Sequence, residues 1–202
     1  MNHLEITTVG TDDRRDEVVR LLARGLRDNP IHVAALGDDA ERRQRDLERL
    51  YSTMLSVGAN EPLLAIRDGE LVAVLGSVAS PHCQPSWWQT LRMTPTLLRL
   101  GRRSVAVGRW GDAWSSRDPD EDHLHFGPIA TDPAHQRTGI GTALMIRRCE
   151  RLDAEGAVGY LETDVESNVR FYERFGFEVV DTAEVLGVES WFMRRAPRQH
   201  DA

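Results

Sequence analysis

The segment 136–142 constrains the fold more than any other stretch, because it joins an apolar, strand-like run over residues 124–131 to a helical run over residues 142–152. Gly139 and Gly141 in this segment let the backbone approach a ligand closely, since no Cβ stands in the way. The first N–H groups of a helix have no intrahelical acceptor, and the helix dipole adds positive charge there. The sequence therefore predicts an α/β protein with a pyrophosphate site at this junction.

Two known types of glycine-rich loop bind pyrophosphates, the P-loop and the dinucleotide-binding loop, and residues 136–142 match neither well. A P-loop requires a Lys-Ser/Thr pair after its second glycine, but Thr142 follows Gly141 directly and all 25 basic residues are arginine. A dinucleotide-binding loop fits better, because Glu162 lies about 20 residues further on. Leu144 nevertheless stands where that loop has its third small residue. A nucleotide-dependent oxidoreductase is therefore a disfavoured alternative.

A second motif, N-x-x-x-Y-x-x-x-G-F, spans residues 168–177. Together with Q-x-x-G-x-G over residues 136–141, in this order and at this distance, it closely resembles the GCN5-related N-acetyltransferase (GNAT) family. The resemblance is strong over residues 124–195, and the tail is most similar to the branch that contains puromycin N-acetyltransferase. It implies a single-domain, mixed α/β acyl-CoA N-acyltransferase fold, with acetyl-CoA as the co-substrate.

The resemblance also implies how the co-substrate binds. In the family, the strand that carries Pro128 separates from the next strand at a bulge, and the pantetheine arm enters the gap. Pro128 has no N–H, so the amide that polarises the thioester carbonyl is expected from Ile129 or just beyond. The family's tyrosine at position 172 protonates the leaving CoA thiolate. Without the resemblance, Pro128 would mark an edge strand and Tyr172 the edge of the core. The expected CoA-binding residues are Ile129, Ala130, Thr131, Gln136, Arg137, Thr138, Gly139, Ile140, Gly141, Thr142, Asn168 and Tyr172.

His123 and His125 project from one face of a strand expected over residues 123–131. An alkylamine with a pKa near 10 is almost fully protonated at neutral pH, which costs about 4 kcal/mol of nucleophile availability. A histidine near the acceptor can remove the proton, directly or through water. Asp122 and Glu162 are alternative bases, and a pair of half-buried, hydrogen-bonding histidines is the plain structural alternative.

The two cysteines, Cys83 and Cys149, predict no disulfide framework and are interpreted as buried or idle thiols. A zinc site that joins His82 and Cys83 to the two strand histidines matches no standard ligand spacing. We therefore expect no metal.

Residues 81–122 interrupt the pattern and hold four of the five tryptophans. This apolar insertion before the strand at residues 123–131 fits a lid over the acceptor, a small helical subcore or a dimer surface. As a lid it would place Trp87 and Trp88 against the acceptor, with Glu162 as a further acceptor-binding residue.

The remaining elements follow from hydrophobic period and turn signals. One helix is expected to begin near 11–13 and to end at Asn29-Pro30, and Asp68-Gly69 predicts a hairpin. The other expected strands are 4–9, 63–67, 71–78, 158–163, 177–185 and 190–195, and the other expected helices are 39–57, 141–155 and 168–175.

Length and charge restrict the class of protein. With 202 residues and 41% hydrophobic side chains, a single domain over residues 1–202 with the insertion 81–122 is expected. A net charge of −7 argues against nucleic acid as a partner, and no leader or membrane span is visible, so a cytoplasmic monomer or homodimer is expected. The interpretation is an acetyl-CoA-dependent N-acetyltransferase that acts directly on a small, cationic amine. A catalytically silent acyl-CoA-binding sensor of the same fold is the alternative.

Overall fold

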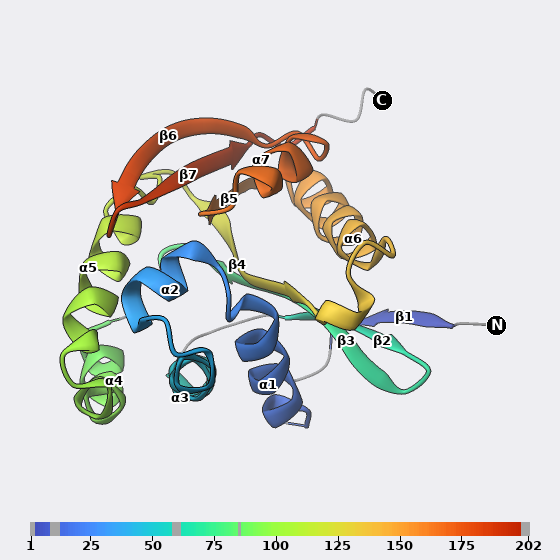
Figure 1. Cartoon of the computed structure of the whole chain (residues 1–202). Helices are drawn as coiled ribbons and strands as arrows, with labels where there is room; N and C mark the ends of the chain where they lie inside the picture. Colours follow the sequence, from blue (N-terminus) through green and yellow to red (C-terminus); the bar gives the residue numbers. More distant parts are fainter. Residues whose placement is uncertain (1–2, 9–12, 58–61, 85, 199–202) are drawn as a thin grey trace.

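The computed structural model describes residues 3–8, 13–57, 62–84 and 86–198 (Figure 1). One mixed sheet has the strand order β1-β2-β3-β4-β5-β7-β6, in which β4 and β5 are parallel and the other neighbours are antiparallel. The strands are β1 (Leu4–Thr7), β2 (Leu63–Arg67), β3 (Glu70–Ala79), β4 (His123–Thr131), β5 (Val158–Thr163), β6 (Glu178–Val185) and β7 (Val188–Arg195). The expected mixed α/β single-domain fold is confirmed.

Helices cover both faces of the sheet and enclose two cores. The first core joins α1 (Arg15–Leu26), α2 (Pro30–Leu36) and α3 (Ala40–Val57) to one face of β2, β3 and β4. The second joins α6 (Ile140–Glu155) and α7 (Glu166–Glu173) to the opposite face. Met145, Cys149 and Leu152 recur at spacings of four and three on the buried side of α6, which explains why this segment is an amphipathic helix.

Several sequence expectations agree with the structure closely. The predicted helix 39–57 is α3, and the strands predicted at 63–67, 123–131 and 158–163 have the same bounds as β2, β4 and β5. Asp68 and Gly69 both have positive φ, at 51° and 88°, as a two-residue turn of type I′ requires. The predicted start of the first helix at 11–13 lies partly outside the described residues, and α1 begins at Arg15.

The expected order of elements was wrong at Asn29-Pro30. The first helix already ends at Leu26, and Pro30 is the first residue of α2, which the sequence did not predict. A proline at the first helical position removes no hydrogen bond, so Asn-Pro suits a helix start as well as a stop. A residue far away in the sequence stabilises the first turn of α2, because the Ile31 N–H donates to Oδ2 of Asp164 at 2.7 Å.

The insertion forms two helices, α4 (Trp87–Leu100) and α5 (Arg103–Ser115). A capping box between Ser86 and Gln89 starts α4, which packs against α3 and α5. The aromatic residues of α5 turn inwards: Trp110 packs edge-on against the buried His32, and Nε1 of Trp114 donates to Oγ of Ser190 at 3.2 Å. Part of the insertion therefore packs against the first core, in which Leu100 is buried. No helix in the described segments has the length and apolar character that crossing a bilayer requires.

Candidate functional site

The strands β4 and β5 pair only at their beginnings and then separate. His123, Leu124 and His125 pair with the residues from Val158 to Tyr160, and the pairing ends there. On its other side, β4 shifts register against β3 between Leu75 and Ser77, opposite Gly127-Pro128. The structure thus has a bulge at the predicted place and a β4 edge that is open towards β5 beyond His125. Because successive strand residues point their N–H groups to opposite edges, part of the backbone around Ile129, Ala130 and Thr131 faces this gap.

The loop after β4 presents unpaired amides at the start of α6. Gly139 precedes the helix with φ 84°, and no side chain caps this end. The first bond into the helix runs from Ala143 N–H to the Gly139 carbonyl at 3.0 Å. Among the described residues, no acceptor bonds the N–H groups of Gly139, Ile140, Gly141 and Thr142. These groups can therefore bind an anion, as their sequence predicts.

Around this helix start, the structure adds an arginine that sequence reasoning missed. Nη2 of Arg174 lies 3.3 Å from Oγ1 of Thr142, and its guanidinium lies 5.0 Å from the ring centroid of Phe171. Arg137 in the loop, with φ 61°, brings a second positive charge. Gln136 donates from Nε2 to the Thr131 carbonyl at 3.4 Å, and Thr138 Oγ1 donates to the His135 carbonyl. The only sequence signal for Arg174 was its place within the motif N-x-x-x-Y-x-x-x-G-F.

The helix α7 places Asn168 and Tyr172 on one side, towards the end of β5. Nδ2 of Asn168 donates to Oγ1 of Thr163 at 3.3 Å. Tyr172 is buried, and its hydroxyl has no hydrogen-bond partner among the described residues. Burial raises the pKa of Tyr172, and the negative charge of Asp164 raises it further. The phenol is therefore neutral at physiological pH.

A partly buried imidazole and two carboxylates meet at the point where β4 and β5 separate. Nε2 of His125 lies 2.8 Å from Oε2 of Glu162, and Nδ1 lies 3.3 Å from Oδ1 of Asp118. Burial lowers the pKa of His125, but the charge of Glu162 and the contact with Asp118 outweigh it, so the pKa lies well above 6.5. Asp118 follows α5, 44 positions before Glu162 in the chain, and nothing in its local sequence indicated this contact.

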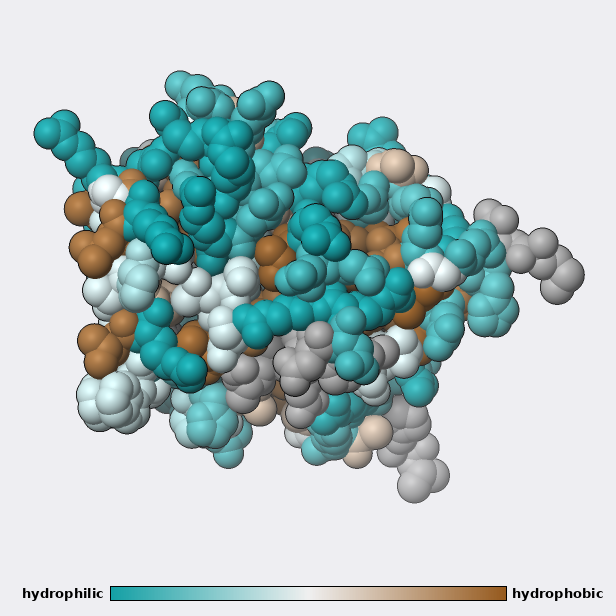
Figure 2. Space-filling view, turned by 90° about the horizontal axis from the view of Figure 1, so that it is seen from below, coloured by the Kyte–Doolittle hydropathy of each residue, from teal (hydrophilic) through white to brown (hydrophobic). Residues whose placement is uncertain are grey.

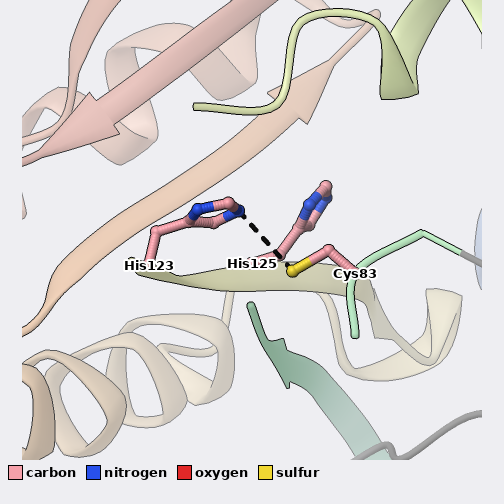
Figure 3. Close-up of side chains that lie close together, drawn as sticks. All are labelled: Cys83, His123 and His125. Atoms are coloured by element: carbon pink, nitrogen blue, oxygen red, sulfur yellow. Dashed lines mark hydrogen bonds between the residues drawn. The ribbon is translucent and has the colours of Figure 1, made fainter. Parts of the chain in front are cut away.

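The second strand histidine meets a cysteine. Nε2 of His123 lies 3.5 Å from Sγ of Cys83, and Figure 3 shows both side chains together with His125 on one side of β4. Burial by itself raises the pKa of the Cys83 thiol, but hydrogen bonding and positive charge from His123 and His125 outweigh it and lower the pKa to about 7. The predicted shared face of His123 and His125 is thus present. Cys83, interpreted from sequence as a buried or idle thiol, lies against it.

Trp87 and Trp88 lie elsewhere. Their indoles stack on each other with ring centroids 4.4 Å apart, and the side chains are 70% and 57% exposed. The helix α4 that carries them is at the lower left of Figure 1, whereas β5 with Glu162 is at the upper centre. Figure 2 shows further apolar surface at the left edge, the side on which α4 and α5 lie. Contact of these tryptophans with the acceptor stays a prediction.

A hollow of about 480 Å³ adjoins the loop on the side of α1 and α2. Gln136, Pro133 and Val165 form one wall, and Arg24 and the turn at Asn29-Pro30 form the other. The unpredicted helix α2 therefore begins at the rim of a hollow that Pro133 and Gln136 of the loop after β4 also line.

Known proteins match this architecture along its whole length. The model of the acetyltransferase (GNAT) family matches residues 30–177. Among solved structures, the histone acetyltransferase HPA2 and related acetyltransferase from Corynebacterium glutamicum is 17% identical, with a TM-score of 0.74 and 100% of both chains covered. The polyamine N-acetyltransferase of Drosophila melanogaster is 12% identical, with a TM-score of 0.63 and coverage of 96% of this chain and 100% of that one. A GNAT family acetyltransferase from Brucella melitensis, in complex with acetyl-CoA, is 16% identical, with a TM-score of 0.54 and coverage of 100% and 95%.

Proposed function

Because the chain belongs to the acetyltransferase (GNAT) family, we propose that it transfers the acetyl group of acetyl-CoA to a primary amine of a small, cationic acceptor, by direct attack in a ternary complex. The observation that carries this proposal is the hydrogen-bonded pair His125–Glu162, which bridges β4 and β5 where the strands separate. It places a proton acceptor beside the gap in which a thioester can lie.

The loop amides fit the pyrophosphate of the co-substrate. Four consecutive N–H groups from Gly139 to Thr142 lack acceptors among the described residues, and Arg137 and Arg174 add positive charge. We assign the pantetheine arm to the open edge of β4, where an amide at or after Ile129 donates to the thioester carbonyl. Asn168 and Tyr172 complete this side of the site from α7.

The reaction needs one proton removed and one supplied. The acceptor nitrogen forms a bond to the acetyl carbonyl carbon, and the bond from that carbon to sulfur breaks. The neutral form of the His125–Glu162 pair receives the proton that the amine loses. The Tyr172 hydroxyl donates a hydrogen bond, and then the proton, to the leaving sulfur. Its raised pKa keeps it protonated until the sulfur develops negative charge.

The cationic acceptor follows from the charge of the site. Two buried carboxylates, Asp118 and Glu162, flank one imidazole, so the cluster is negative even when His125 is protonated. An ammonium group bound there brings a second positive charge beside the imidazolium, and their repulsion favours loss of a proton. The similarity to a polyamine N-acetyltransferase supports trying polyamines. The likeness of the tail to the puromycin N-acetyltransferase branch supports trying aminonucleosides.

A thiol-release assay tests the proposal. Acetyl-CoA is incubated with the protein and with each of a panel of polyamines, aminonucleosides, aminoglycosides, arylalkylamines and amino acids. We expect at least one amine class to accelerate CoA release, and Glu162→Gln to abolish most of that acceleration. Glu166→Gln is the matched control, because Glu166 is 76% exposed on α7. Tight CoA binding with no amine-dependent release would instead favour the sensor.

A further inference from the structure

Cys83, His123 and His125 form a cluster whose chemistry the proposed reaction uses only in part. One donor atom from each of the three residues lies within 4.8 Å of the other two. The turn after β3 brings the cysteine there: His82 N–H donates to the Ala79 carbonyl, and Ser80 exchanges two hydrogen bonds with the backbone of His123. Cys83 is thus folded back over β4 by hydrogen bonds that involve neither imidazole (Figure 3).

Each imidazole has one nitrogen held by an acceptor and the other available. Nδ1 of His123 is 2.8 Å from the Glu121 carbonyl, which can only accept, so Nδ1 carries the hydrogen and Nε2 presents a lone pair towards Cys83. Nε2 of His125 is held by Glu162 at 2.8 Å. Nδ1 of His125 is buried and has no partner with hydrogen-bond geometry among the described residues. Backbone carbonyls and carboxylates orient metal-binding histidines in this way.

We propose that Sγ of Cys83, Nε2 of His123 and Nδ1 of His125 bind one divalent late first-row transition metal ion, with Zn²⁺ as the reference ion. A fourth position is left for solvent, and Asp118 adds negative charge next to it, with Oδ1 3.3 Å from Nδ1 of His125. The expectation of no metal came from ligand spacing along the chain, because a site of His82 and Cys83 with the two strand histidines matches no standard zinc pattern.

The distances and donor types agree with this class of ion. Bond lengths near 2.3 Å to sulfur and near 2.0 Å to nitrogen at a tetrahedral centre require S···N separations of about 3.5 Å. The separation between Cys83 and His123 is 3.5 Å. A thiolate with two imidazoles is a borderline-soft donor set that favours zinc, cobalt or copper over magnesium and calcium.

Occupation of the site has a consequence that depends on the proposed function. A metal ion on Nδ1 takes the lone pair that His125 would use as part of the base. Metal binding should then inhibit acetyl transfer, although Cys83 has no part in the transfer itself. Cys83→Ser is expected to keep the transfer rate of the metal-free wild type and to lose inhibition by Zn²⁺.

The primary test measures metal binding alone, without acetyl-CoA. Metal-free protein is titrated with Zn²⁺ in competition with a chromogenic chelator, and Co²⁺ is added in parallel to record the thiolate-to-cobalt absorption band. We expect one equivalent of each metal per wild-type chain. Cys83→Ser and His123→Asn should weaken Zn²⁺ binding by more than about 100-fold, beyond the 10- to 100-fold typical of an orienting residue, and Cys83→Ser should lose the cobalt band.

Cys149→Ser is the matched control, since Cys149 is the other free thiol and lies buried on α6. It should bind both metals as the wild type does. Equal Zn²⁺ affinity of the wild type and Cys83→Ser, or a wild-type cobalt spectrum without a thiolate band, would overturn the proposal even if a variant folded poorly. An inactive protein that binds Zn²⁺ through Cys83 would leave this site standing and refute only the acetyl transfer.

Discussion

Replacing Gly141 by alanine should weaken CoA binding without destabilising the protein. An ideal Cβ at this position lies 3.7 Å from both Cζ of Phe171 and Oγ1 of Thr131, which are ordinary contact distances. The methyl group therefore fits the protein. It occupies the space between the end of β4 and α7, directly at the unpaired amides, where a phosphate has to approach.

Gly141→Ala should raise the stability of the protein and lower its affinity for CoA, and both changes can be estimated. Glycine to alanine within a helix, at a compatible backbone conformation, stabilises by about 0.4–1 kcal/mol through the unfolded state. A hydrogen bond to a charged group contributes about 1.5–3 kcal/mol, so loss of one amide-phosphate bond weakens CoA binding about 10- to 150-fold. Gly141→Val should weaken it further because its side chain is larger.

Titration calorimetry with CoA and thermal melting measure these two quantities. Gly108→Ala is the matched control, because Gly108 lies in α5 and its added Cβ has no heavy atom within 4 Å. That variant should gain similar stability and keep its CoA affinity. Folded Gly141→Ala and Gly141→Val proteins that bind CoA as tightly as the wild type would refute the placement of the pyrophosphate on these amides.

Three further changes test the remaining parts of the structure. Tyr172→Phe should lower kcat by about 10²-fold while CoA affinity and melting temperature stay unchanged. Wild-type turnover in this variant would show that Tyr172 only packs at the edge of the core. Asp153→Asn should cost about 3 kcal/mol of unfolding free energy at pH 7, since Asp153 binds the buried Arg195 guanidinium through both oxygens. The hydrogen bonds from Arg195 lower the pKa of Asp153. The wild type should therefore lose the stabilisation from this ion pair as the pH falls below about 4, whereas the variant has none to lose. Parallel acid denaturation curves of the two proteins would contradict this. Trp88→Ala should raise the acceptor KM if α4 covers the acceptor, whereas Trp110→Ala should mainly lower stability, by about 3 kcal/mol, because it packs on His32; unchanged kinetics for Trp88→Ala would remove it from the acceptor site.

Local sequence signals were sufficient for most of the fold. The apolar, strand-like run that ends at Thr131 predicts β4, and Asp68-Gly69 predicts the hairpin turn. The glycines of residues 139–141 predict the unpaired helix start that the structure contains. These features depend on backbone conformations and periods that a few neighbouring residues determine, so they are legible without knowledge of the rest of the chain.

The helix α2 shows where such signals fail. Seven residues are too few to establish a helical period, and Asn29-Pro30 is compatible with either a stop or a start. One interaction that holds its first turn is the bond from Ile31 N–H to Asp164, a residue that follows β5. No pattern around residue 30 contains that information.

The sequence by itself determined that His123 and His125 share a strand face, because side chains alternate with a period of two. Only the tertiary structure decided what faces them. Cys83 comes from the turn after β3, Asp118 from the end of α5 and Glu162 from the neighbouring strand β5. The period of a strand fixes the direction of its own side chains, whereas the groups opposite depend on strand order and on the paths of long connections, which are set by packing of the whole chain.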